Sequence, residues 1–208
     1  MRASQGLTLL EAVLVFALMM GLMLLITAFF IKGQRYATAS ETYGSTQRQA
    51  TILLGRMVDE LHKASRLHMM VGSSNDEIAA ISFADPEGAS AGQPEVQFDT
   101  STGRLVWKKW VAFYHDEPTR QVRRVETPLP STTTDLAAAP TPLPDFPTLR
   151  SNPQAKPIGQ DVRDFEVGLT ATGASLTVTV AKQVPLSMLK EAEKDVSVTV
   201  RMDVHMLN

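Results

Sequence analysis

The chain has 208 residues, of which 44% are hydrophobic and 20% are charged, and its formal net charge is −2 at pH 7. This length suits one ordinary domain plus an accessory segment. The near-neutral charge points to no particular class of partner, and the absence of cysteine excludes disulfides as well as thiolate metal and redox sites.

An uncharged run of twenty residues extends from Ala12 to Ile31 and is followed by Lys32 and Arg35. About 20 apolar residues in a helix cover the ~30 Å hydrocarbon core of a bilayer. The sequence contains no second run of this kind. It therefore predicts one membrane-spanning helix near the N-terminus.

Three interpretations compete for this segment. A cleaved secretory signal fits poorly, because the apolar run is too long and because Lys32 and Arg35 precede the small-residue site at 37–39. A plain signal anchor explains the length but leaves Glu11 unexplained, since an acid at the centre of a span costs about 2.5–3.5 kcal/mol. In the third interpretation, Glu11 pairs with a positive charge that another molecule supplies.

The run Gly6-Leu7-Thr8-Leu9-Leu10-Glu11, followed by an uninterrupted apolar helix, resembles the N-terminus of type IV pilins and type II secretion pseudopilins. In that family a prepilin peptidase cuts after the glycine and methylates the new N-terminal residue. The resemblance implies a leader peptide of residues 1–6, cleavage between Gly6 and Leu7, and N-methylation of Leu7. Leu7 stands where the family most often has phenylalanine.

The same resemblance implies a role for Glu11 in assembly. The apolar helices of such fibres bundle at the centre, so that Glu11 of one subunit meets the Leu7 amine of its neighbour. A half-made charge pair in a low-dielectric setting is costly, and the pair therefore selects the register of assembly more than it adds stability. The implied partners are other pilin or pseudopilin subunits, the prepilin peptidase, an inner-membrane assembly platform and membrane lipid. The implied location is the inner membrane, crossed once, with the head in the periplasm or outside the cell.

Beyond the membrane run, apolar residues recur at steps of three and four, which is typical of one face of a helix. They are Ala50, Leu53, Leu54, Met57, Val58, Leu61, Ala64 and Leu67. No proline precedes Pro86. The sequence therefore predicts one long helix from about Thr8 to about Leu67, with a transmembrane half over residues 7–31 and an amphipathic half over residues 32–70.

From residue 71 onwards the apolar period changes to two, which predicts β-strands. The predicted strands cover residues 78–83, 96–99, 105–114, 121–126, 165–170, 175–182 and 196–206, with a hairpin turn at 100–103. In the strand 105–114, alternation places Trp107 on the same face as Val111 and Phe113. We expect an α+β fold in which the long N-terminal helix packs on an antiparallel β-sheet head, residues 71–208, as in pilins.

Residues 127–157 hold eight of the twelve prolines. Proline cannot donate ladder hydrogen bonds and favours extended chain, so this stretch predicts a long loop or semi-rigid insertion between two halves of the sheet. A tolerated surface loop is favoured over a binding role. The order of helix, meander, insertion and closing strands most resembles minor pseudopilins of the J type or related minor pilins.

A basic segment lies between Arg104 and Arg124, where six basic residues outnumber two acidic ones. The candidate partner contacts are Arg104, Lys108, Lys109, Arg123 and Arg124. Basic residues interleaved with Trp107, Trp110 and Tyr114 suit single-stranded nucleic acid. A solvated strand face, or a contact to an acidic neighbouring subunit, is the favoured interpretation.

Signals for catalysis are weak. Residues 88–92 match G-x-S-x-G, but the proline-containing flanks provide neither the strand nor the helix of a nucleophile elbow. The four histidines lack metal-ligand spacing. We expect no catalytic residue, cofactor or metal, and predict a minor pilin or pseudopilin. The alternatives are a DNA-binding minor pilin of a competence system and a signal-anchored periplasmic domain of other function.

Overall fold

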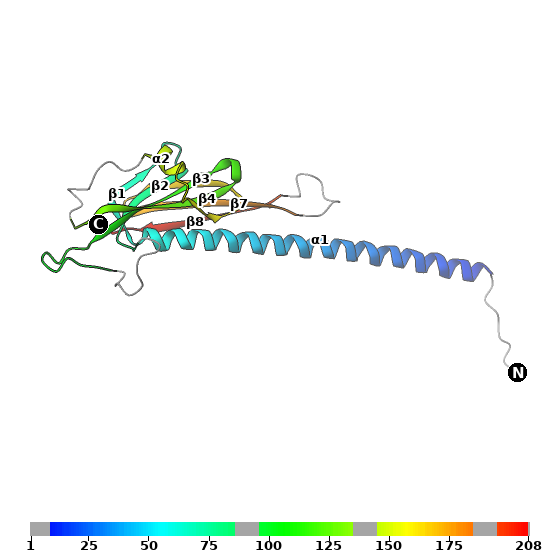
Figure 1. Ribbon diagram of the computed structural model, residues 1–208. Coiled ribbons are helices and arrows are strands. Elements are labelled where there is room, and N and C mark those ends of the chain that lie inside the picture. Colours follow the sequence, from blue (N-terminus) through cyan, green and yellow to red (C-terminus); the bar gives the residue numbers. More distant parts are fainter. Residues whose placement is uncertain (1–8, 86–95, 135–144, 185–194, 208) are drawn as a thin grey trace.

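The computed structural model describes residues 9–85, 96–134, 145–184 and 195–207. Its first element is helix α1, Leu9–Leu61, an unbroken run of 53 residues. At 1.5 Å per residue this helix is about 80 Å long. Its N-terminal half stands clear of the β-rich head, while its C-terminal half lies against the head (Figure 1). Its buried residues all belong to the second half and are Thr46, Ala50, Leu53, Leu54, Met57 and Leu61.

Two antiparallel sheets form the described part of the head, with the strand orders β1-β2-β3-β4-β5 and β6-β7-β8. The first sheet consists of β1 Ala64–Val71, β2 Glu77–Ser82, β3 Trp107–Asp116, β4 Gln121–Thr133 and β5 Lys156–Gly159. The second consists of β6 Val162–Thr170, β7 Gly173–Gln183 and β8 Asp195–His205. A 3-10 helix, Glu117–Thr119, joins β3 to β4, and helix α2, Phe146–Arg150, lies between β4 and β5. These elements confirm the expected α+β fold.

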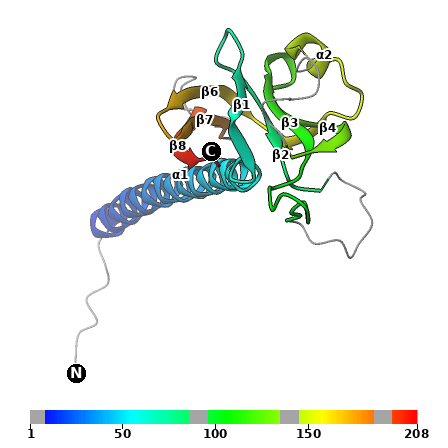
Figure 2. The same cartoon turned by 90° about the vertical axis from the view of Figure 1, so that its left-hand side faces the viewer.

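The two sheets meet beside β1. Ser65 forms a parallel bridge with Leu207, and the Arg66 amide donates a hydrogen bond to the Leu207 carbonyl at 2.8 Å. Viewed from the end, β6–β8 lie on one side of β1 and β2–β4 on the other, with α1 running beneath (Figure 2). The helix therefore covers the junction between the sheets.

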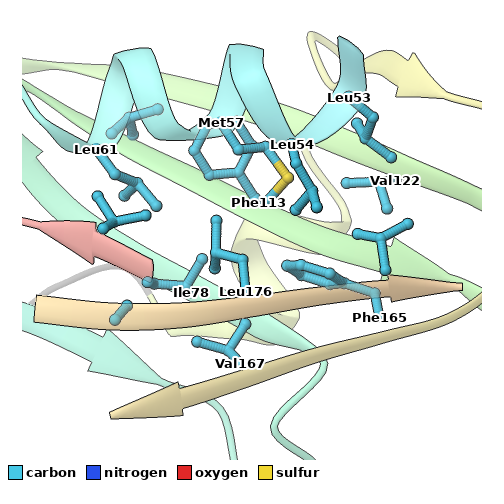
Figure 3. Packing of buried hydrophobic residues seen from close by; sticks show 14 of the residues in the cluster. Leu53, Leu54, Met57, Leu61, Ile78, Phe113, Val122, Phe165, Val167 and Leu176 are labelled. Atoms are coloured by element: carbon cyan, nitrogen blue, oxygen red, sulfur yellow. The ribbon is translucent and has the colours of Figure 1, made fainter. Parts of the chain in front are cut away.

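The main core fills the space between α1 and both sheets (Figure 3). Leu54, Met57 and Leu61 from the helix are fully buried there. They pack in one cluster with Phe113 of the first sheet and Phe165 of the second. The predicted apolar stripe is thus the surface that holds the helix to the head.

The predicted C-terminal end of the helix, and with it the amphipathic half to residue 70, is wrong. The helix ends at Leu61, and Ala64 begins β1, which pairs with β2 from Ala64↔Ser82 to Val71↔Ile78. The Lys63 carbonyl accepts hydrogen bonds from the Phe83 amide (3.1 Å) and the Ser82 hydroxyl (3.0 Å) instead of a helical partner. These tertiary bonds outweigh a helical spacing that continues by coincidence for two more positions, 64 and 67.

Two details of the predicted strands also differ. Residues 96–99 form no full strand and contribute the bridge Phe98↔Leu105. The predicted turn at 100–103 is confirmed: the Gly103 amide donates to the Asp99 carbonyl at 2.7 Å, and Gly103 has φ +65°. A register shift between Trp107 and Lys109 breaks the alternation in β3. Trp107 therefore packs with Trp110 in a separate cluster rather than with the main core.

The proline-rich segment 127–157 is not an insertion between two halves of a sheet. Its beginning extends β4 to Thr133, and its end supplies α2 and β5, so both ends belong to the first sheet. β5 pairs with β4 only from Val122 to Arg124, so β4 is an edge strand at position 128. Proline is tolerated there because no β5 residue needs a hydrogen bond from its missing N–H group. Residues 135–144 lie outside the described residues.

Helix α2 covers the face of the first sheet that points away from α1. Leu149 is 3% exposed and packs against Tyr114. Arg150 holds the helix in place by donating from Nε to Glu77 Oε2 at 2.9 Å and from Nη2 to Asp76 Oδ2 at 3.1 Å. Burial raises the pKa of Glu77, and the bond and charge of Arg150 oppose this rise without cancelling it.

The raised pKa of Glu77 predicts a specific pH dependence of stability. The folded chain holds this proton more tightly than the unfolded chain, so the contribution of Glu77 to stability falls as the pH rises from about 4.5 through its folded-state pKa. Denaturant unfolding across this range should show wild type losing stability relative to Glu77→Gln. Glu117 is exposed, so the unfolding free energy of Glu117→Gln should change with pH as that of wild type does. If the unfolding free energy of Glu77→Gln also changed with pH as that of wild type does, the prediction would be contradicted.

Candidate membrane and assembly site

The N-terminal half of α1 presents an apolar surface that no other described element covers. Phe16, Leu22 and Phe30 are 70%, 60% and 64% exposed. Soluble proteins rarely expose a contiguous apolar patch larger than a few hundred Å². Among the described residues, α1 is the one helix long and apolar enough to cross a membrane. A bilayer or the apolar helices of other chains are the environments that would cover this surface.

The local chemistry of this half suits an apolar environment. Thr27 is the only residue between Ala12 and Ile31 with a polar side chain, and its hydroxyl donates to the Met23 carbonyl at 2.8 Å. In hydrocarbon every polar group must find its partner within the protein. The helix meets that requirement along the whole run.

Glu11 lies in the first turn of α1, at the start of the apolar surface. The positive end of the helix dipole stabilises a carboxylate in this position by about 0.3–1 kcal/mol in exposed settings. Gly6 and Leu7, the predicted processing residues, lie outside the described residues. The structure therefore places the predicted assembly residue but does not describe the cleavage site.

The five candidate partner contacts do not form one surface. Arg104 is exposed before β3, and Arg123 makes an ion pair from Nε to Asp116 Oδ2 at 2.9 Å. Lys108 pairs with Asp85. Lys108 and Lys109 are only 6% and 1% exposed, so the expected solvated strand face is wrong for these two residues. The reason is that both faces of β3 are covered.

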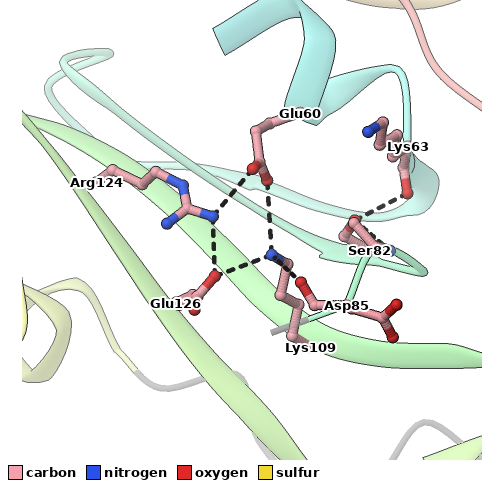
Figure 4. A network of polar contacts seen from close by, with 8 residues as sticks. Glu60, Lys63, Ser82, Asp85, Lys109, Arg124 and Glu126 are labelled. Atoms are coloured by element: carbon pink, nitrogen blue, oxygen red, sulfur yellow. Dashed lines mark hydrogen bonds and ion pairs between the residues drawn. The ribbon is translucent and has the colours of Figure 1, made fainter. Parts of the chain in front are cut away.

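Lys109 and Arg124 belong to a partly buried ion network that joins the last turn of α1 to the first sheet (Figure 4). Arg124 Nη2 donates to Glu60 Oε1 at 2.9 Å and to Glu126 Oε2 at 2.8 Å. Lys109 Nζ donates to Glu126 Oε2 and to the Asp85 carbonyl, both at 2.9 Å, and lies 3.9 Å from Glu60 Oε2. Two cations thus balance two carboxylates between the helix and strands β3 and β4.

The carboxylates of the network favour the charged form of Arg124. Burial by itself lowers the pKa of Arg124, but the attraction of Glu60 and Glu126 and their hydrogen bonds outweigh burial and raise it. The pairing of Glu60 with Arg124 could not be predicted from the sequence, because the two residues are 64 positions apart. The one available hint is that Lys109 falls among the apolar residues of a predicted strand, where a cation needs a carboxylate partner.

Within the described ranges, no three His, Asp or Glu side chains are grouped so that they could hold a metal ion. The G-x-S-x-G stretch at 88–92 lies outside those ranges. The site that the residues do build is an exposed apolar helix with a carboxylate in its first turn, rigidly continued into a folded head. Comparisons of the chain with protein-family models, with curated proteins and with solved structures found no match.

Proposed function

We propose that this chain is a minor pilin or pseudopilin, a non-enzymatic subunit of a type IV pilus-like or type II secretion pseudopilus fibre. Before assembly, the N-terminal half of α1 anchors it in the inner membrane with the head on the periplasmic side. The observation that carries the proposal is the continuity of α1 from the exposed apolar half into the core of the head.

A rigid continuation favours assembly over simple anchoring. A signal anchor needs only a tether, and a flexible linker would serve that purpose. Here Leu54 and Leu61 of the same helix lie at 0% exposure in the head, so the position of the head fixes that of the apolar rod. Such a rod can exchange lipid for the helices of neighbouring subunits while its apolar surface stays covered.

The place of Glu11 fits the same proposal. A carboxylate beside an apolar run is costly to bury unless a cation reaches it. With cleavage after Gly6, the amine of Leu7 lies four residues before Glu11, or about 6 Å along a helix axis. A neighbouring subunit shifted by roughly one turn brings its amine level with Glu11, which supports the pairing that the resemblance implies.

Processing is the first test. Gly6→Val should leave unprocessed protein in the membrane, because a branched side chain replaces the small residue at the cleavage site, whereas Ala3→Val in the same leader should be processed normally. Intact-mass measurement of the wild type should find an N-terminus at methylated Leu7. An N-terminus at Met1, or at Ser40 after the small residues 37–39, would refute the proposed function.

Glu11 provides the second test. Glu11→Ala should still be inserted and cleaved, since the span becomes more apolar, but its recovery in sheared fibres should fall about tenfold or more because a neighbour's amine is left unpaired. Glu41→Ala removes an exposed carboxylate from the same helix and should assemble like wild type. Equal recovery of the two variants would show that the charge pair is dispensable.

The DNA-binding alternative has less support from the described residues. Trp107, Trp110 and Tyr114 are at most 5% exposed, so their rings offer no platform for base stacking. The cations beside them are compensated by acids, as in the Lys109–Glu126 pair. We therefore prefer a structural subunit to a nucleic-acid receptor.

A further inference from the structure

A groove runs along the head between α1 and β5. It consists of two adjoining hollows of about 550 and 530 Å³, which share Arg56 and Ile158 in their linings. On the helix side it extends from Ser45 to Glu60, with Lys63 just beyond the end of α1. Fifteen helical steps of 1.5 Å make this stretch about 22 Å long, enough for about seven residues of extended chain. We call it the α1–β5 groove.

The α1–β5 groove carries an excess of positive charge. Its basic lining residues are Arg48, Arg56, Lys63, Lys109, Arg124, Lys156 and Lys182, and its acidic ones are Asp59, Glu60, Asp85 and Asp161. Lys109 and Arg124 are compensated by Glu60 and Glu126, and Asp85 by Lys108. Outside these pairs the described lining includes the basic residues Arg48, Arg56 and Lys182 against the acidic residues Asp59 and Asp161. The groove is thus basic although the whole chain has a net charge of −2.

An apolar residue interrupts the basic rim. Ile52 is 49% exposed and lines the groove between Arg48 and Arg56, one helical turn from each. The opposite wall contributes Ile158 from the edge strand β5. An apolar contact flanked by two guanidinium groups complements a segment in which acidic residues flank an apolar one.

We infer that the α1–β5 groove docks an acidic, amphipathic segment of a neighbouring subunit. The inference rests on the proposed function for the identity of the partner as a fibre subunit, while the chemistry of the groove stands without it. A polypeptide fits better than nucleic acid, because the exposed Ile52 between the two arginines can pack against an apolar side chain but finds no counterpart in a phosphate backbone. Phe113, the one aromatic residue in the lining, is 1% exposed and cannot stack with bases.

The test uses the full-length chain in non-ionic detergent and three fluorescent probes. They are a peptide of alternating glutamate and leucine about seven residues long, the same peptide with lysine for glutamate, and a single-stranded oligothymidylate of matched length. Anisotropy should show saturable binding of the acidic peptide alone. Tighter binding of the oligothymidylate, equal binding of the lysine peptide, or no binding of the acidic peptide up to about 1 mM would overturn the inference.

Charge reversal locates the binding. Arg48→Glu/Arg56→Glu should raise the Kd of the acidic peptide about tenfold or more. Arg163→Glu/Arg201→Glu makes the same change of net charge at exposed positions of β6 and β8, outside the groove, and should change the Kd less than about twofold. Circular dichroism checks that both variants are folded. Equal weakening by the two variants would show general charge attraction and overturn the docking site.

Crosslinking in the producing cells tests the identity of the partner. Ile52→p-benzoylphenylalanine should crosslink to an acid-rich segment of another fibre subunit, identified by mass spectrometry, whereas Leu169→p-benzoylphenylalanine on β6 should not. If the N-terminus is methylated Leu7 but neither crosslinking nor peptide binding is found, the docking role of the groove is refuted and the proposed function stands. If the acidic peptide binds in the groove but the chain is never processed, the proposed function is refuted and the docking role stands.

Discussion

Leu54→Asp should leave the head unfolded at room temperature. Leu54 is fully buried between α1 and the sheets, within the cluster that includes Phe113 and Phe165. Truncating such a leucine typically costs about 2–5 kcal/mol, and an unpaired buried charge adds several more. Domains are stable by only about 5–15 kcal/mol, so one substitution is enough to remove the folded state.

A neighbouring position on the same helix provides the control. Ile52 is 49% exposed, so Ile52→Asp should cost less than about 1 kcal/mol. The comparison can use residues 37–208, because this fragment keeps every buried residue of α1, the first of which is Thr46. Thermal melts followed by circular dichroism should show a cooperative transition for Ile52→Asp and none for Leu54→Asp. Similar melts for the two variants would contradict the assignment of the core.

The second large effect is expected at Lys109. Lys109→Met removes a cation that is 1% exposed and leaves Glu60 and Glu126 to share Arg124. Breaking a fully buried ion pair on one side usually costs about 3–5 kcal/mol, because the remaining charge is uncompensated. The side chains of Glu60 and Glu126 are 27% and 14% exposed, so we expect a loss at the lower end of this range. Denaturant unfolding of the same fragment should show this loss. Arg123→Met, which breaks an ion pair with a 30% exposed side chain, should cost about 1 kcal/mol or less.

A double substitution separates lost charge balance from lost packing. Lys109→Met/Glu126→Gln removes one cation and one carboxylate and leaves Arg124 paired with Glu60. The two single changes should therefore not add, and the double variant should be more stable than Lys109→Met. If the two costs simply add, packing of the lysine stem accounts for the loss, and the network has no electrostatic role in stability.

Patterns that depend on neighbouring residues could be predicted from the sequence. The spacing of Leu53, Leu54, Met57 and Leu61 identified the helix face that packs on the sheets, and alternation placed β2, β3, β7 and β8 within a few residues. These features follow from the local geometry of helices and strands. The apolar run and the position of Glu11 at its start were equally visible, because both depend on one continuous segment.

Features that depend on distant partners could not be predicted. The end of α1 is decided by hydrogen bonds from Ser82 and Phe83 to the Lys63 carbonyl, and the spacing around Lys63 contains no trace of them. Proline content suggested a loose loop, yet Leu149 and Arg150 dock α2 on the sheet through contacts with residues more than thirty positions away. The acid partners of Lys109 and Arg124 were hidden for the same reason.

The unbroken helix also determines how the molecule carries mechanical load. A pull on the Leu9 end of α1 is directed along the helix axis, so the contacts from Ala50 to Leu61 are sheared together instead of being peeled apart one by one. The load then passes to β1, which is held by β2 on one edge and by Leu207 on the other. The head is therefore attached to its shaft in the direction in which it is hardest to detach.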